Sequence, residues 1–316
     1  MSMSPQTLAL VLPCYNEEAI LEYTASACLK KVIDLESKFN FGTSIIVLVD
    51  DGSKDNTWAI IEGLCKGESS RFRGLKLSKN CGHQNALFSG LMYARNYSDC
   101  IISLDADLQD DINVIDEMIE KFLKGNQIVY GIRKSRSTDS NYKKLTARIF
   151  YKLMLIMGVD IIYDHADYRL TSRRVLNELE EYKESNLFLR AIFPQLGFKS
   201  DKVYYDRLVR TAGETKYPFS KMLNFAIEGI TSSSISPLRY IAIIGFIAMI
   251  LSFMGALWAL YTKFTNQGVP GWASIVLPIY FISGLQIASI GVLGEYIGKI
   301  YKETKRRPKY IVEKII

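Results

Sequence analysis

Two aspartates and a glutamine that follow a short apolar segment carry the strongest chemical signal in the chain. Asp105, Asp107 and Gln109 alternate directly after residues 101–104, which predict the end of a buried strand. The point where a strand leaves a sheet for a loop is a common ligand site. Carboxylate and amide oxygens suit Mg²⁺ or Mn²⁺ and leave coordination positions for substrate phosphates. The alternative is a polar turn whose acids are only solvated.

The composition narrows the class of protein. A chain of 316 residues can hold one large domain and an appendix. The net charge of +6 is modest, and the last basic cluster follows an apolar segment, which indicates a membrane surface rather than nucleic acid. The 5 cysteines lack C-x-x-C spacing, so we expect neither a disulfide framework nor a zinc site, and a reducing cytoplasm fits best. No secretory signal is expected, because the N-terminal apolar run is too short.

Alternating apolar and amphipathic segments predict the architecture around the acids. Strand alternates with helix four times, which is typical of a doubly wound, mostly parallel α/β sheet. The expected strands are residues 7–12, 44–49, 74–77 and 100–104, with a further strand at 127–131. The first expected helix extends to about residue 32. The other three cover residues 58–65, 84–95 and 112–123.

The polar residues at the ends of the first two expected strands indicate a nucleotide. No G-x-G-x-x-G follows the first strand, where Tyr15, Asn16 and Glu17 stand instead, so a dinucleotide-binding enzyme is not favoured. Asp50 and Asp51 end the second strand. Acidic loops suit hydrogen bonding to a base and a ribose, provided that a cation handles the phosphates that carboxylates would repel. A nucleoside diphosphate is therefore the better prediction.

Cations and a second acidic turn follow the fifth expected strand. Arg133 begins a basic segment that includes Lys143. This segment either binds an anionic phosphate or forms a solvated face. Asp167 stands two residues before Arg169. The two residues either belong to the site or form a structural ion pair only. The 2 histidines, His83 and His165, are interpreted as structural or loop residues.

A glycine-containing segment, residues 207–218, offers a further phosphate contact. Gly213 permits a tight turn that would aim Thr215 and Lys216 at a phosphate. A surface hairpin is the alternative.

Two uncharged segments near the C-terminus predict transmembrane helices. Residues 241–261 and 272–293 contain no charged residue, and each would span roughly 30 Å as a helix. The loop between them carries one cation and the segment after them carries many, so both termini are expected to face the cytoplasm. Residues 219–230 form an apolar stripe that suits an interfacial helix, with a core helix as the alternative. We expect four regions: a catalytic domain (1–218), a juxtamembrane amphipathic helix (219–236), the two transmembrane helices (237–295) and a basic cytoplasmic segment (296–316).

Several motifs together resemble a known family. Residues 12–18 (L-P-C-Y-N-E-E), 50–57 (D-D-G-S-K-D-N-T) and 105–110 (D-A-D-L-Q-D) resemble the family 2 glycosyltransferases of GT-A fold. Residues 167–170 (D-Y-R-L), 213–217 (G-E-T-K-Y) and the two spans are similar to the polyprenyl-phosphate glycosyltransferase branch, which includes GtrB-like bactoprenol glucosyltransferases and, more distantly, dolichyl-phosphate mannose synthases. The Q-x-x-R-W motif of processive synthases is absent, so polymer synthesis is not expected.

The resemblance implies roles for particular residues. Asp105, Asp107 and Asp167 would act in catalysis, and Asp105, Asp107 and Gln109 would hold Mg²⁺ or Mn²⁺. The nucleotide would be held by Pro13, Tyr15, Asn16, Glu17, Asp50, Asp51, Lys79 and Asp105. The acceptor phosphate would be held by Arg133, Lys143, Arg210, Thr215 and Lys216. Lys143 stands where the family often has Arg, and Thr215 stands where it often has Ser.

The implied reaction is the transfer of one hexose with inversion. Glucose from UDP-glucose would move to undecaprenyl phosphate at the cytoplasmic face of the inner membrane. Other sugar donors, GDP-mannose or a UDP-linked modified aminoarabinose, remain open because few hydrogen bonds set sugar selectivity. A non-catalytic nucleotide-binding membrane scaffold is the alternative from another class. Small residues in the spans permit close helix packing, so we expect a homo-oligomer, a tetramer by resemblance. These residues are Gly245, Gly255, Gly284, Gly291 and Gly294.

Overall fold

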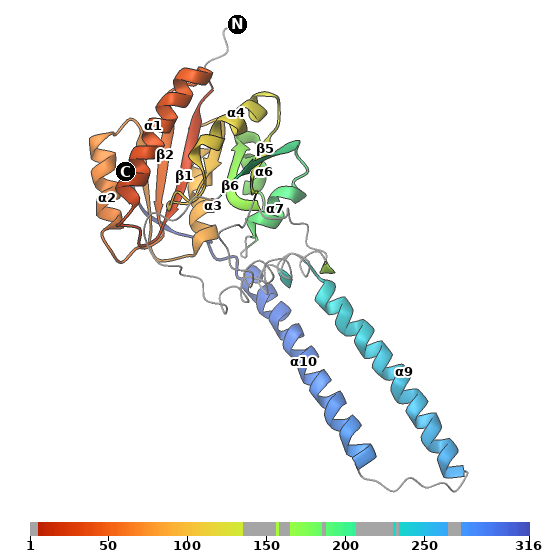
Figure 1. Ribbon diagram of the computed structural model, residues 1–316. Helices are drawn as coiled ribbons and strands as arrows, with labels where there is room; N and C mark the ends of the chain where they lie inside the picture. The colour runs from red at the N-terminus through yellow and green to blue at the C-terminus, as the bar shows by residue number, and fades with distance from the viewer. Residues whose placement is uncertain are drawn as a thin grey trace.

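The computed structural model describes residues 6–134, 156–157, 165–184, 188–206, 230–231, 234–264 and 273–316. These residues form a sheet domain from which two long helices project (Figure 1). The strands are β1 (Leu8–Cys14), β2 (Ile45–Asp50), β3 (Phe72–Leu77), β4 (Cys100–Ser103), β5 (Ile128–Arg133), β6 (His165–Ser172), β7 (Ser200–Tyr205) and β8 (Val312–Ile315). The helices are α1 (Leu21–Phe39), α2 (Thr57–Gly67), α3 (His83–Ala94), the 3₁₀ helix η1 (Ile112–Val114), α4 (Ile115–Leu123), α6 (Arg173–Glu180), α7 (Leu189–Gln195), α9 (Ser236–Phe264) and α10 (Ala273–Thr304).

Within the part of the chain that the structure describes, the strands form one sheet in the order β7-β5-β6-β4-β1-β2-β3-β8. Strands β3, β2, β1 and β4 run parallel, and β5 runs parallel to β7. Strand β6 is antiparallel to β4 and β5, and β8 is antiparallel to β3. The prediction of an α/β domain is confirmed. The sheet is mixed, because β6 and β8 enter it in the direction opposite to their neighbours.

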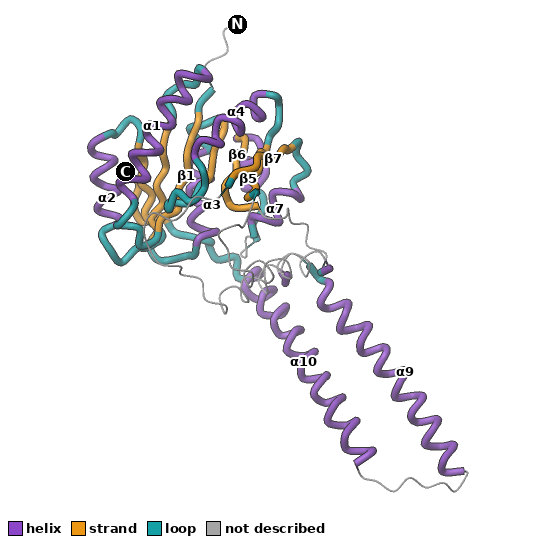
Figure 2. Tube along the Cα trace, viewed as in Figure 1, coloured by secondary structure: helices purple, strands orange, loops and turns teal. Residues whose placement is uncertain are grey.

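The sheet is covered by helices on both faces (Figure 2). In β1, Leu8, Leu10 and Leu12 pack toward α1, α2 and α4, whereas Ala9 and Val11 pack toward α3, α6 and α7. All the residues of β1 and β2 are buried. Burial on both faces explains why these strands read as continuous apolar runs without alternation.

The register of the parallel strands brings their carboxyl ends to one edge. Cys14 pairs with Asp50, and Val11 pairs with Ser103, so the loops that follow β1, β2 and β4 start side by side. In Figure 1, β1 and β2 run downward, and these loops therefore lie on the side of the domain from which α9 and α10 project. The acids that follow the strands share this edge.

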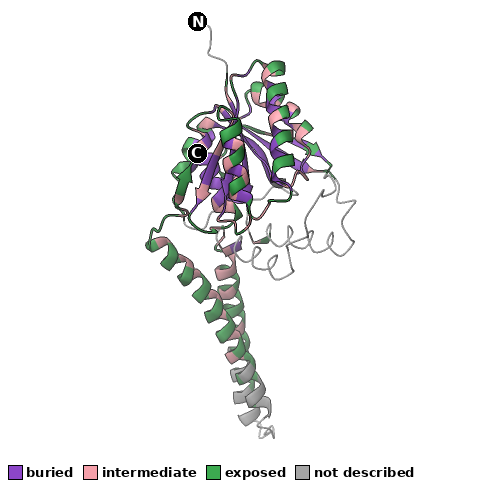
Figure 3. Ribbon diagram, turned by 90° about the vertical axis from the view of Figure 1, so that its left-hand side faces the viewer, coloured by how far each residue is buried: buried purple, intermediate pink, exposed green. Residues whose placement is uncertain are grey.

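Helices α9 and α10 contain 29 and 32 residues and run beside one another (Figure 1). Many of their large apolar side chains are exposed, including Phe253, Trp258 and Phe281. Figure 3 accordingly shows most of the described part of both helices in the colour for exposed residues. Among the described residues, the segment Phe281–Thr304 is long and apolar enough to cross a membrane, and Ser236–Ala248 is a shorter apolar helix. Of the expected interfacial segment 219–230, residues 219–229 lie outside the described residues.

The segment expected as a basic C-terminal tail has a more specific structure. Helix α10 continues to Thr304, and residues 312–315 then form β8 at the edge of the sheet. Figure 1 accordingly marks the C-terminus beside α2, inside the sheet domain. This strand was not predicted from the sequence.

Candidate active site

The loops after β1 and β2 are joined by hydrogen bonds from main chain to side chain. The N–H of Asn16 donates to Ser53 Oγ (3.0 Å), and Asn16 Oδ1 accepts from the N–H of Lys54 (2.8 Å). The N–H of Glu17 donates to Thr57 Oγ1 (2.9 Å). Asn16 has a φ of 53°, a left-handed conformation that asparagine tolerates. Asn16, which was expected to bind the nucleotide, therefore also fixes the shape of the loop that presents Tyr15. Tyr15 is exposed, whereas Pro13 is buried.

The two acids at the end of β2 organise the neighbouring loops. Asp50 is fully buried; its Oδ1 accepts from the N–H of Ser53 (3.1 Å), whereas its Oδ2 has no hydrogen-bond partner among the described residues. Asp51 accepts from the N–H groups of Cys81 (2.6 Å) and Gly82 (3.0 Å). Burial raises the pKa of Asp51, while these two hydrogen bonds lower it. The β2 and β3 loops are thereby held together, with Lys79 exposed between them.

The Asp105–Gln109 loop brings carboxylates to the centre of this edge. Asp105, Asp107 and Gln109 are each partly exposed, and the N–H of Gln109 donates to Asp107 Oδ1 (3.2 Å). Thr24 Oγ1 donates to the carbonyl of Ala106 (2.7 Å) and anchors the loop to α1. Leu108 has a φ of 48°, which turns the chain sharply between Asp107 and Gln109.

The electrostatics of this loop fit a divalent cation. Burial raises the pKa of Asp105 to about 6; His83 lowers it, and the carboxylates of Asp110, Asp167 and Asp107 raise it. Such crowding of acids creates a negative potential that a cation would relieve. Among the described residues, no three His, Cys, Asp or Glu side chains converge as a closed metal site. Two carboxylates with one amide oxygen match the open, oxygen-rich set that Mg²⁺ uses with phosphate ligands.

Asp167 lies next to this loop in a cage of hydrogen-bond donors. Arg190 Nε donates to its Oδ1 (3.2 Å), and Arg190 Nη2 donates to its Oδ2 (2.9 Å). Gln84 Nε2 also donates to Oδ2 (3.2 Å), and His83 Nε2 lies 3.4 Å from the same oxygen and 3.7 Å from Asp105 Oδ1. Burial raises the pKa of Asp167, but Arg190 and His83 outweigh it and hold the pKa well below the ordinary value. Asp167 is therefore a fixed anion.

Arg169 supports the cage from the interior. It is fully buried, its Nη2 lies 3.6 Å from Asp167 Oδ1, and its guanidinium has no hydrogen-bond partner among the described residues. The guanidinium carbon of Arg169 lies 3.7 Å from the centre of the Phe193 ring and 5.9 Å from the centre of the Tyr130 ring. Burial lowers the pKa of Arg169 to about 10, so it stays charged at neutral pH. The expected ion pair of Asp167 and Arg169 is present, and Asp167 also faces the site.

Arg133 stands at the end of β5 in a cluster with Asp110 and Tyr205. Its Nη2 donates to Asp110 Oδ1 (3.2 Å), and its Nε donates to Tyr205 Oη (3.3 Å). Tyr205 Oη in turn donates to Asp110 Oδ1 (2.5 Å). Burial lowers the pKa of Arg133, but Asp110 and Tyr205 outweigh burial and raise the pKa above its ordinary value. The guanidinium therefore stays charged. Its side chain is 24% exposed, which leaves one side open to solvent.

The remaining acceptor residues of the prediction, Lys143, Arg210, Thr215 and Lys216, lie outside the described residues. Three further side chains of the site were not predicted from the sequence. Gln84 and Arg190 had no local signal, and His83 was interpreted as a structural or loop residue. All three converge on Asp167 from α3 and α7.

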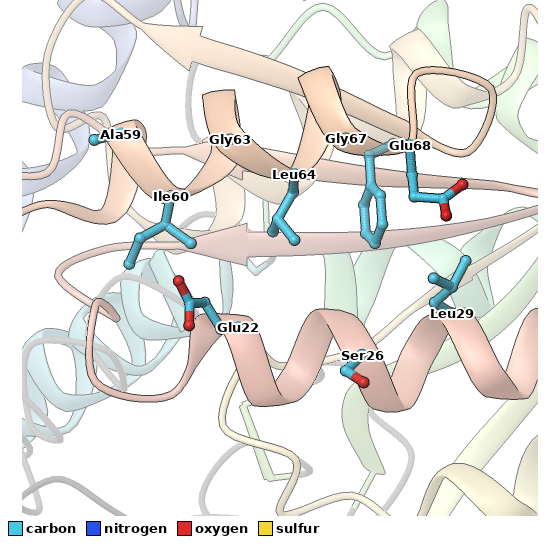
Figure 4. A pocket seen from close by; sticks show the side chains of 10 residues that line it. Glu22, Ser26, Leu29, Ala59, Ile60, Gly63, Leu64, Gly67 and Glu68 are labelled. Carbon is cyan, nitrogen blue, oxygen red and sulfur yellow. The ribbon is translucent and has the colours of Figure 1, made fainter.

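A shallow hollow of about 620 Å³ lies elsewhere, between α1 and α2 (Figure 4). Its walls include Leu29, Ile60, Leu64 and Phe72, with Glu22 at its rim. None of the acids of the strand-end edge lines it. It therefore does not belong to the candidate active site.

Comparisons with known proteins identify the class. Residues 9–180 match the family described as Glycosyl transferase family 2. The chain is 49% identical over 314 residues to the "Uncharacterized glycosyltransferase YkoT" of Bacillus subtilis, which covers 99% of this chain and 93% of that protein. It is 40% identical over 310 residues to the prophage bactoprenol glucosyl transferase homolog of Escherichia coli, covering 98% and 99% of the two chains. It is 39% identical over 309 residues to the bactoprenol glucosyl transferase of Shigella phage SfII, covering 97% of each.

The chain therefore belongs to glycosyl transferase family 2, and its mixed α/β sheet is the GT-A-like fold that the motifs implied. It is an enzyme, a glycosyltransferase. This result excludes the alternative of a non-catalytic scaffold.

Proposed function

We propose that this glycosyltransferase moves a single glucose from UDP-glucose to a polyprenyl phosphate of the bactoprenol type. The observation that carries the proposal is the near full-length similarity to a bactoprenol glucosyl transferase and to a prophage bactoprenol glucosyl transferase homolog. Such coverage includes the C-terminal helices as well as the sheet domain, and these helices would keep a lipid acceptor within reach. The sugar nucleotide would lie over the loops after β1, β2 and β4, with Pro13, Tyr15, Glu17, Asp51 and Lys79 among its contacts.

The anchoring of the enzyme is part of the proposal. Helices α9 and α10 would both cross the inner membrane, with the sheet domain and both termini in the cytoplasm. The exposed apolar side chains of both helices support this arrangement, because lipid tails would cover them. Glycines in the helices, among them Gly284 and Gly291, would allow helices of neighbouring subunits to pack closely in an oligomer.

The chemistry would be a single displacement with inversion. An oxygen of the lipid phosphate attacks the anomeric carbon, the new carbon–oxygen bond forms, and the bond from that carbon to the diphosphate breaks as UDP leaves. A phosphate monoester has its second pKa near ~6, so the attacking group is already ionised at neutral pH and needs no strong base. Asp167, held as an anion by Arg190, would orient the sugar or the acceptor rather than remove a proton.

A divalent cation would be held by Asp105, Asp107 and Gln109. When bound, it supplies charge neutralisation for the departing diphosphate. Arg133 would hold the acceptor phosphate, together with Lys143, Arg210, Thr215 and Lys216. The protein's task is thus to bring two anionic substrates together and to balance their charge.

A transfer assay tests the proposal. The full-length protein in membranes would be given polyprenyl phosphate, Mg²⁺ or Mn²⁺, and in turn UDP-glucose, GDP-mannose and a UDP-linked aminoarabinose. We expect labelled lipid with UDP-glucose. The sugar in UDP-glucose is α-linked, so transfer with inversion would give a β-linked sugar on the lipid. Labelled lipid with only another nucleotide sugar would overturn the choice of glucose. No labelled lipid with any of them would overturn the acceptor class.

A further inference from the structure

The segment after α10 connects the long helices to the active-site edge. We call residues 305–316 the C-terminal strap. They leave the end of α10 at Thr304, contact α3 and the turn after α6, and end as β8 beside β3. The strap thus joins the part of the chain with the exposed apolar helices to the sheet domain by a second route, in addition to the start of α9.

The strand of the strap is fixed at the edge of the sheet. Leu75 pairs with Ile315, Lys76 with Lys314 and Leu77 with Val312, with a bulge between the last two pairs. Beyond β8, the main chains of Gly74 and Ile316 exchange two hydrogen bonds (2.9 and 3.0 Å). A Cβ on Gly74 would lie 2.8 Å from Ile316 Cγ1, so glycine permits this close approach. The bulge changes which face of the sheet each side chain meets.

The middle of the strap packs on α3 and contacts the turn that follows α6. The ring of Tyr310 meets the ring of Phe88 edge to face, with centroids 6.3 Å apart. Lys309 Nζ lies 4.6 Å from the centre of the Phe88 ring and donates to the carbonyl of Tyr182 (2.6 Å). Phe88 belongs to α3, the helix whose first turn carries His83 and Gln84. The strap therefore holds the helix that supplies two of the contacts to Asp167.

The same segment also touches the loop between β3 and α3. The N–H of Ser78, the first residue after β3, donates to the carbonyl of Ile311 (3.0 Å). This loop, residues 78–82, is the one whose N–H groups hold Asp51. On its other side, a Cβ on Gly52 would lie 2.6 Å from the nitrogen of Asn80, and Gly52 has a φ of 66°. The 78–82 loop is thus clamped between the strap and the loop that follows β2.

We propose that the C-terminal strap positions the 78–82 loop, and through it Asp51, for binding of the sugar nucleotide, with Tyr310 as the main positioning residue. The inference rests on the proposed function only in taking the strand-end edge as the nucleotide site. Tyr310 touches neither substrate; it acts through Phe88 and the adjacent main chain. The long helices and the nucleotide site are then mechanically linked, and loosening the strap affects the sugar nucleotide more than the lipid acceptor.

The test compares three variants of the full-length enzyme. Tyr310→Ala removes the aromatic contact, Tyr310→Phe keeps it, and Lys314→Ala is the matched control on the same strap. Lys314 pairs with Glu62 of α2 (2.6 Å), on the side of the sheet away from the 78–82 loop. For Tyr310→Ala we expect the KM for UDP-glucose and the Kd for UDP to rise about fivefold, the worth of one aromatic pair. The KM for the lipid should stay unchanged, and Tyr310→Phe and Lys314→Ala should match the parent enzyme.

Amide hydrogen exchange gives a readout that does not depend on activity. Exchange of residues 78–82 should be faster in Tyr310→Ala than in Tyr310→Phe, while exchange in β1 stays the same. If Tyr310→Ala does not fold, Lys309→Met replaces it, since it removes the bond to the Tyr182 carbonyl but keeps the aliphatic stem. Equal loss of affinity for both substrates, or identical behaviour of the Ala and Phe variants, would overturn the inference. A parent enzyme that transfers no sugar contradicts the proposed function instead, and the exchange experiment still tests the strap.

Discussion

Arg190 binds Asp167 through two parallel hydrogen bonds, from Nε to Oδ1 (3.2 Å) and from Nη2 to Oδ2 (2.9 Å). The pair joins α7 to β6 at the point where β6 leaves the active-site edge. A bidentate guanidinium contact fixes the plane of a carboxylate as well as its charge. The orientation of Asp167 is therefore set by a residue 23 positions further along the chain.

Arg190→Gln should lower kcat more than it raises either KM. The carboxylate of Asp167 would lose its fixed plane, and a small misplacement of a positioning group costs up to about a hundredfold in rate. Arg190→Lys keeps the charge but not the fork, and it should restore only part of the loss. Steady-state kinetics of both variants and of Asp167→Asn check this. The double variant Asp167→Asn/Arg190→Gln should be no worse than Asp167→Asn alone, and additive losses would contradict the coupling.

Asp107→Ala should abolish transfer together with metal-dependent binding of UDP. Its carboxylate is part of the set expected to hold the cation, and Mg²⁺ binding at such sites rests on one or two carboxylates. Calorimetric titration of UDP with and without Mn²⁺ measures the effect. Asp111→Asn is the control, since Asp111 lies four residues away and caps η1 through the N–H of Asn113. Transfer retained in Asp107→Ala would remove the metal site from the mechanism.

Arg133→Gln should raise the KM for polyprenyl phosphate about tenfold or more, because a charge-assisted contact to a phosphate is lost. The KM for UDP-glucose should change little. Tyr205→Phe serves as the comparison: it removes the hydrogen bonds of Tyr205 Oη to Asp110 and from Arg133 Nε, but keeps the guanidinium and the ring against Tyr168, 5.3 Å away. If the two variants have the same effect, Arg133 acts only through the Asp110 cluster and does not bind the acceptor.

Glu36→Gln should weaken the fold at neutral pH by about 1–3 kcal/mol, the value of a charge-assisted hydrogen bond. Glu36 joins Arg71 and the N–H of Ser44. Burial raises its pKa, but these partners bring it below the ordinary value of 4.5. The stabilisation is therefore present above pH 4.5 and is lost as the pH falls through the lowered pKa. Melting temperatures of parent and variant should converge at low pH. Asp34→Asn, at an exposed side chain, should not change the curve.

The sequence predicted the parts of the fold that have a local pattern. Strands β1, β2 and β4 are apolar runs ended by polar residues, and their loops carry Asp50, Asp51 and Asp105 to one edge as expected. Strand β8 was missed because Val312–Ile315 carries two charges, and its partner β3 lies far away in the sequence. A strand at the edge of a sheet needs no continuous apolar run, so composition alone does not reveal it.

The residues of the candidate site that belong to sequence motifs were predicted. Those that reach the site only through contacts between distant parts of the sequence were missed. Asp105, Asp107 and Asp167 do lie at one edge, and His83 lies between two of them. Gln84 and Arg190 reach Asp167 from helices on the other side of the loop, and no spacing rule links them to it. Their roles depend on how α3 and α7 pack against β6, which only the assembled sheet specifies.

The two ends of the sheet are protected by different means. Strand β7, at one end, carries the charged side chains of Asp201 and Lys202, which discourage pairing with another molecule. Strand β3 reads F-R-G-L-K-L, with a buried apolar side that would attract a foreign strand if it were left bare. By lying along β3, residues 312–315 act as an intramolecular shield, so a chain shortened before Val312 should tend to aggregate even where its catalytic residues are intact.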